Sequence, residues 1–151
     1  MGNNMQQRVT PRAAQIVAAA VMASNVVYVL VGVLVPLAAG GEGLARLDTQ
    51  TAQLVQTLLL AVGVMTSLAS FVIRKAFLEP AILRQADTLP NRTRVVIISM
   101  AMAESAGILG LVCALMTGQL AIPAILWACS IATGILHFPT RAWLESAPQS
   151  R

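Results

Sequence analysis

The chain has 151 residues, of which 57% are hydrophobic and 11% are charged, and its formal net charge is +4. Soluble domains carry about a quarter charged residues, so this chain has too little polar surface to cover a water-exposed globule. The composition indicates an integral membrane protein whose partners include the lipid bilayer. We expect no nucleic-acid partner, because orientation in a bilayer with anionic headgroups accounts for the positive charge.

Four apolar segments follow one another along the chain, and each approaches the roughly 20 residues that a helix needs to cross the hydrocarbon core. They predict an all-α fold, a single membrane domain over 1–151, with four transmembrane helices at about 13–38, 50–74, 94–117 and 120–138. The turn after residue 117 is tight, which favours antiparallel hairpins. We expect a loop at 75–93, within which residues 76–86 either extend the second helix or form a short one.

Basic residues are distributed unevenly between the predicted connections. The N-terminal tail, the 74–94 segment and the C-terminal tail hold most of them, whereas the connection between the first two helices holds only Arg46. Loops rich in Lys and Arg remain on the cytoplasmic side. The sequence therefore predicts cytoplasmic N and C termini, a cytoplasmic 75–93 loop, and a multi-pass protein of the cell (plasma or inner) membrane.

Small residues form a stripe on the third predicted helix. They recur at steps of three and four, which places them on one face, and Gly63 adds a small residue on the second helix. Such stripes let membrane helices approach closely, so we expect these positions to serve helix packing. The stripe consists of Ser99, Ala103, Ala106, Gly110 and Ala114.

Glu104 is the one charged residue within the third apolar segment, residues 95–117, and lies near its middle. An ionised carboxylate costs on the order of 2.5 kcal/mol or more at such a depth, so burial favours the protonated form. A carboxyl that is neutral in lipid and ionises near water meets the requirement for a proton carrier. The alternative is a structural role in which Glu104 hydrogen-bonds across helices to Asn25, Gln56 or Thr66.

Two stretches around this acid carry a recognisable pattern. Residues 84–87 read Arg-Gln-Ala-Asp, and residues 101–112 read Ala-Met-Ala-Glu-Ser-Ala-Gly-Ile-Leu-Gly-Leu-Val. Over about residues 61–117 the chain resembles the c-subunit (proteolipid) family of rotary ATPases. That family has an Arg-Gln-Pro loop followed by a helix with a central acid and a Gly-Leu-Val sequence.

The resemblance implies a proton-translocating proteolipid in which Glu104 and Ser105 form the proton-binding site. It also implies that the loop residues Arg84, Gln85 and Asp87 contact a stalk or partner, and that the chain associates with copies of itself or with other membrane subunits. Too few oxygen ligands accompany Glu104 for a hard cation such as sodium. A non-catalytic accessory or structural subunit of a larger membrane complex is the alternative.

Other chemistry has little support in the sequence. We expect no enzyme activity, no cofactor and no metal site, because no phosphate loop, ligand cluster or nucleophile set is present. Haem ligation by His137 is an alternative to an interfacial role for that residue. Cys113 and Cys129 lie inside apolar segments without a Cys-x-x-Cys spacing, so we expect them to be packing residues.

Overall fold

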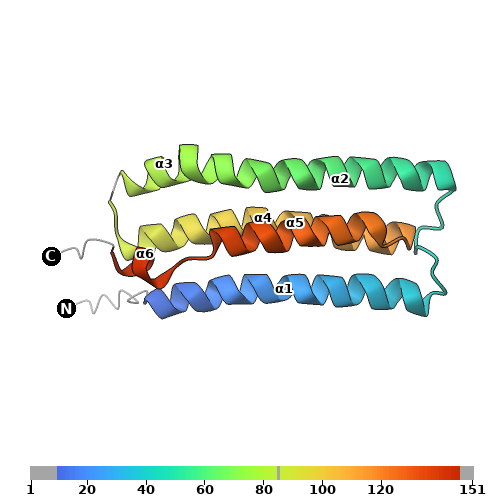
Figure 1. The fold of residues 1–151 in the computed structure, drawn as a ribbon, viewed down its shortest axis with the longest axis horizontal. Helices are drawn as coiled ribbons and strands as arrows, with labels where there is room; N and C mark the ends of the chain where they lie inside the picture. The colour runs from blue at the N-terminus through green and yellow to red at the C-terminus, as the bar shows by residue number, and fades with distance from the viewer. Residues whose placement is uncertain (1–9, 85, 147–151) are drawn as a thin grey trace, which may run out of the picture.

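The computed structural model describes residues 10–84 and 86–146, and all regular structure within these ranges is helical. The long helices are α1 (Pro11–Ala38), α2 (Thr49–Val72), α4 (Leu89–Thr117) and α5 (Ala121–His137) (Figure 1). Short segments η1 (Ile73–Leu78) and α3 (Glu79–Leu83) extend α2, and α6 (Arg141–Glu145) follows α5. The predicted all-helical fold is confirmed for this part of the chain.

Length and apolarity distinguish three of the described helices. The stretches Pro11–Ala38, Thr49–Leu83 and Leu89–Thr117 are each long and apolar enough to cross a membrane. Helix α5 is apolar too, but with 17 residues it is shorter. The spans predicted in the first three segments are therefore compatible with the structure, and the fourth is represented by a shorter apolar helix.

Local capping explains where several helices begin and end. Thr10 precedes Pro11, and its hydroxyl accepts a hydrogen bond from the Ala13 amide at 3.2 Å. Asp48 accepts from the amides of Gln50 and Thr51, at 3.1 and 3.0 Å. Ser, Thr and Asp at this position satisfy amides that lack a partner in the first turn. Gly118, with a φ of 69°, ends α4 in the left-handed conformation that glycine adopts without strain.

Helix α4 is the interior element of the bundle. It contacts α1, α2 and α5, and α1 and α2 flank the α4–α5 pair from opposite sides (Figure 1). In the most apolar window of α4, 44% of the residues are buried, compared with 17% in α1 and 22% in α2. The outer faces of α1 and α2 consequently expose large apolar side chains, among them Leu34, Leu54 and Leu68.

The small residues of α4 are buried between helices. A Cβ atom on Gly110 would lie 2.8 Å from Nε1 of Trp127, and one on Gly63 would overlap Leu126 of α5. These glycines leave room for large α5 side chains against the neighbouring helices. The predicted stripe is buried throughout, at Ser99, Ala103, Ala106, Gly110 and Ala114.

Part of the segment at 75–93 is helical, in agreement with one of the two alternatives expected for residues 76–86. Helical structure continues from α2 to Leu83 and resumes at Leu89, so residues 76–83 extend the second helix. Pro90 lies in the first turn of α4, where its missing amide hydrogen costs nothing, whereas Pro80 lies inside the continuous helical run from α2 to α3. A π-helical turn precedes Pro80, and the Glu79 amide there reaches back to the carbonyl of Arg74.

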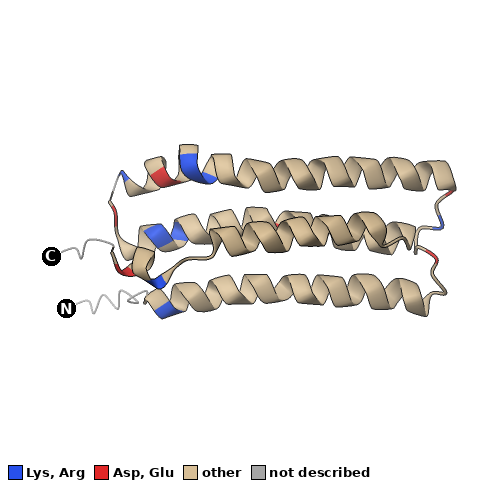
Figure 2. Ribbon diagram, in the orientation of Figure 1, with Lys and Arg blue, Asp and Glu red and all other residues tan. Residues whose placement is uncertain are grey.

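The two ends of the bundle differ in charge. Figure 2 shows that the basic residues gather at the end where the described chain starts and stops, in α1, η1, α4 and α6. The opposite end carries Glu42, Arg46 and Asp48 in the connection between α1 and α2. The bundle therefore presents one strongly basic end and one end of mixed charge.

Candidate functional site

Glu104 lies near the middle of α4 and faces α1. The Tyr28 hydroxyl donates a hydrogen bond to its Oε1 at 2.7 Å, and the Ser24 hydroxyl contacts the same oxygen. Ser24 and Tyr28 are four residues apart on α1, which places them on one face of that helix. In the described ranges no Lys, Arg or His forms an ion pair with Glu104.

A second polar group lies beside this carboxyl. Asn25 of α1 and Ser130 of α5 are 2% and 1% exposed, so both are fully enclosed by helices. The Ser130 hydroxyl lies 2.7 Å from Asn25 Oδ1 and 2.9 Å from the Ala103 carbonyl oxygen. Gly107 leaves the space that the Asn25 amide occupies. Three helices therefore meet through polar contacts at the level of Glu104.

The proposed structural partners of Glu104 are not the ones that contact it. Asn25 bonds with Ser130, Gln56 donates to Gln119 at 3.0 Å, and Thr66 donates to the carbonyl of Val62 on its own helix. The sequence-based candidates did not include Ser24 and Tyr28, the two residues that contact Glu104. Their spacing of four residues, which places both on one face of α1, was the available signal.

Ser105 does not join Glu104. Its hydroxyl donates to the Met102 carbonyl of α4 at 2.6 Å, a bond within its own helix. Adjacent positions on a helix point about 100° apart, so the two side chains face different directions. Of the predicted pair, Glu104 therefore contacts side chains of α1, whereas Ser105 bonds to the backbone of its own helix.

The loop residues predicted to contact a partner have different surroundings. Arg84 is exposed at the end of α3, and Gln85 lies outside the described residues. Asp87 accepts two hydrogen bonds from Arg92, at 2.6 and 2.7 Å. The carboxylate of Asp87 therefore holds the start of α4 in place.

His137 lies in a polar cluster that sequence analysis did not anticipate. It is 1% exposed; its Nε2 lies 2.9 Å from the Ser70 hydroxyl and its Nδ1 lies 3.1 Å from Nη1 of Arg74. Arginine can only donate, so Nδ1 accepts and Nε2 carries the hydrogen. Glu79 bonds in turn with Arg74 at 3.0 Å. Because both ring nitrogens are engaged, His137 has none free to ligate haem iron.

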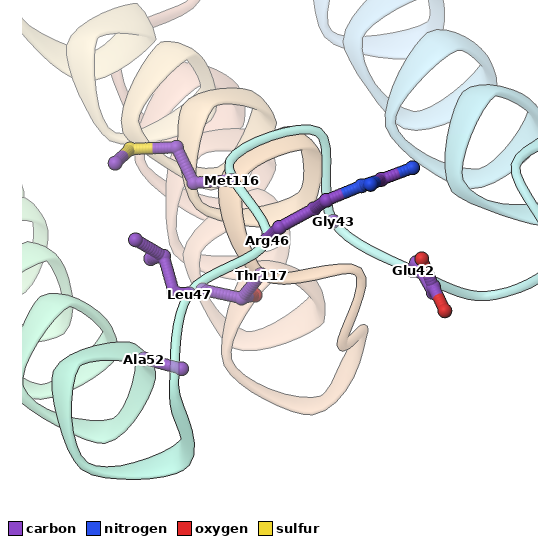
Figure 3. A pocket seen from close by; sticks show the side chains of 7 residues that line it. All are labelled: Glu42, Gly43, Arg46, Leu47, Ala52, Met116 and Thr117. Carbon is purple, nitrogen blue, oxygen red and sulfur yellow. The ribbon is translucent and has the colours of Figure 1, made fainter.

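A cavity of about 630 Å³ lies at the opposite end of the bundle from this cluster. Figure 3 shows Arg46 reaching past Gly43, with Leu47 and Ala52 on the α2 side. Met116 and Thr117 at the end of α4 contribute to its wall. It is a surface feature of the α1–α2 connection, remote from the middle of α4 where Glu104 lies.

Comparisons with known proteins assign no family to this chain: no family model, no curated protein and no solved structure matches it. Within the described residues, no group of three or more His, Cys, Asp or Glu side chains is arranged to hold a metal ion. Glu104 and its contacts therefore provide the basis for a functional hypothesis.

Proposed function

We propose that this chain is a multi-pass protein of the cell (plasma or inner) membrane in which Glu104 binds and releases a proton, as in the proteolipids it resembles. The observation that carries this proposal is the placement of one carboxyl near the middle of the interior helix, with hydroxyl partners and no basic partner among the described residues. Intramembrane acids with such surroundings are typical of proton pathways.

The hydrogen-bond geometry around Glu104 can accommodate the protonated carboxyl that this proposal requires. The Ser24 hydroxyl has a single hydrogen, yet it lies 2.6 Å from the Val21 carbonyl oxygen and also contacts Glu104 Oε1. A carboxylic acid resolves this conflict, because Glu104 then donates to Ser24 while Ser24 donates to Val21. Tyr28 still donates to Oε1 in this arrangement.

The proposed topology has four spans in antiparallel hairpins with both termini in the cytoplasm. The basic end of the bundle supports this orientation, since Lys and Arg are retained on the cytoplasmic side. Helix α5 has 17 residues, the lower limit of roughly 17–25 for a transmembrane helix.

The test is labelling of Glu104 with dicyclohexylcarbodiimide, which modifies protonated carboxyls in membranes. The full chain in lipid vesicles is treated across a pH series, and the modified residue is located by mass spectrometry. We expect modification at Glu104 that declines as pH rises, and none in Glu104→Gln. Glu42→Gln is the control, because it changes an exposed acid in the connection between α1 and α2. Glu104 in this variant should be modified as it is in the parent chain. Labelling that is absent at every pH, or independent of pH, would overturn the proposal.

A non-catalytic accessory subunit is the second candidate, and the bonds between Glu104 and α1 favour it. Those contacts lie within one chain, so they would hold α1 against α4 without any proton transfer.

If holding α1 is the only role of Glu104, the variant Glu104→Gln keeps the hydrogen bonds and leaves a parent complex fully active. Glu104→Leu would instead destabilise the bundle. Native mass spectrometry in mild detergent separates the assemblies, since a closed ring of identical copies supports the proteolipid and a single copy among unlike subunits supports the accessory role.

A further inference from the structure

A groove of about 230 Å³ lies between α3 and the first turns of α4, at the basic end of the bundle. Its walls are apolar, formed by Ile82 on one side and by Ile97 and Ile98 on the other, and its polar groups are Asn91 and Arg94. None of these residues has a role in the Glu104 site.

Arg94 places a positive charge at this groove without an ion-pair partner among the described residues. Its side chain is exposed, and within residues 10–84 and 86–146 it forms no ion pair. Asp87, the acid nearest to Arg94 along the sequence, already accepts two hydrogen bonds from Arg92. Asn91 donates one amide hydrogen to the Ala86 carbonyl at 2.7 Å, which leaves its second amide hydrogen for another acceptor.

The apolar wall on α4 begins one helical turn after Arg94. Ile97 and Ile98 follow Arg94 by three and four positions, so they share its face of α4. They are 41% and 40% exposed, although neighbouring Val95 and Val96 are fully buried. A ligand for this groove must therefore be anionic at one end and apolar along its length.

We infer that the groove binds one anionic phospholipid, with its phosphate at Arg94 and Asn91 and an acyl chain along Ile97 and Ile98 against Ile82. The positive charge of Arg94 favours an anionic headgroup, because basic residues close to the membrane surface attract anionic lipids. The apolar wall selects a lipid over free phosphate, which would gain nothing from three isoleucines. This inference rests on the proposed membrane location and is independent of proton binding by Glu104.

The test is retention of lipid by the purified full chain in detergent, measured by native mass spectrometry with added phosphatidylglycerol or phosphatidylcholine. We expect one phosphatidylglycerol to be retained preferentially, and Arg94→Gln to weaken that retention about fivefold or more. Arg12→Gln, which removes an exposed cation from α1 at the same end, is the control and should retain lipid as the parent chain does.

Two further measurements keep the outcomes distinct. Glycerol 1-phosphate should not displace the lipid, and displacement at equal concentration would overturn the lipid assignment in favour of a phosphate site. Ile98→Ser should weaken retention without changing the helical signal in circular dichroism. Equal loss in Arg12→Gln and Arg94→Gln would overturn the groove, because it would indicate attraction to the whole basic end. Labelling of Glu104 stands or falls separately from these results.

Discussion

Gly107 sets the distance between α1 and α4 at the level of Glu104. A Cβ atom there would overlap the Asn25 amide oxygen and would lie 3.1 Å from the Ser130 hydroxyl and 3.3 Å from the Tyr28 ring. Asn25 and Ser130 are fully buried and bonded to each other, so neither can move without breaking that contact. The contact of Glu104 with Tyr28 therefore depends on the absence of a side chain three residues away.

Gly107→Ala should lower stability by about 1–3 kcal/mol, because the extra methyl overfills a packed contact between three helices. Thermal unfolding of the purified protein in detergent measures the change. Ala101→Val adds bulk at an exposed position of the same helix and should shift the midpoint little. Equal stability of Gly107→Ala and the parent chain would show that α1 approaches α4 less closely than described.

At the scale of elements, Arg92 joins the start of α4 to the C-terminal helix α6. Its guanidinium bonds to both carboxylate oxygens of Asp87, to the Trp143 carbonyl and, at 2.8 Å, to the Ser146 hydroxyl. It also lies 5.0 Å from the centre of the Trp143 ring, and Arg74 lies 5.7 Å from the same ring. Trp143 thus contacts guanidinium groups from two helices, which fixes α6 across the basic end.

Acid should weaken this junction. The hydrogen bonds from Arg92 lower the pKa of Asp87 below its ordinary value of 3.8, and they outweigh burial, which raises it. Because the folded-state pKa is depressed, the stabilisation is complete above the unfolded pKa and is lost as pH falls through the folded one. Asp87→Asn should therefore unfold at a lower temperature than the parent chain at pH 7, and the two should converge as the pH falls through the lowered pKa of Asp87.

Unfolding curves measured across that pH range test this. Arg92→Gln removes the same ion pair and should lose the same pH-dependent part of the stability. If Asp87→Asn kept the full acid sensitivity of the parent chain, another carboxyl would be responsible.

At the scale of the whole molecule, the two ends of the bundle differ in charge while the sides are apolar. Exposed leucines on the outer faces of α1 and α2 point away from the α4–α5 pair. Contact between these apolar faces and lipid has no hydrophobic cost, whereas their exposure to water would be unfavourable. The asymmetry of the ends is what orients such a bundle in a membrane.

Single cysteines report that orientation directly. In a chain in which Cys113 and Cys129 are replaced by alanine, Ala45→Cys should react with an impermeant maleimide from outside intact cells. Ala86→Cys should react only after permeabilisation. Both positions are exposed, so burial does not explain a difference between them. Reaction of Ala86→Cys in intact cells would reverse the proposed topology.

The helical type and the approximate positions of the described long helices followed from the sequence, because run length, apolarity and charge are properties of neighbouring residues. Glu104 was found for the same reason, as a charge that interrupts an apolar run. The stripe on α4 was readable because its spacing is that of one helix face. Two arrangements stayed open for residues 76–86, because the sequence alone does not show whether a helix continues past Pro80 or a separate one begins there.

Only the tertiary structure decided what the polar groups do. Ser24 and Glu104 are 80 residues apart in the chain, and the pairing of His137 with Arg74 spans 63. Which helix faces which depends on how glycines and large side chains fit together in three dimensions, and no local pattern contains that information. The acid was visible in the sequence, while its hydroxyl partners became known only when α1 was seen to lie against α4.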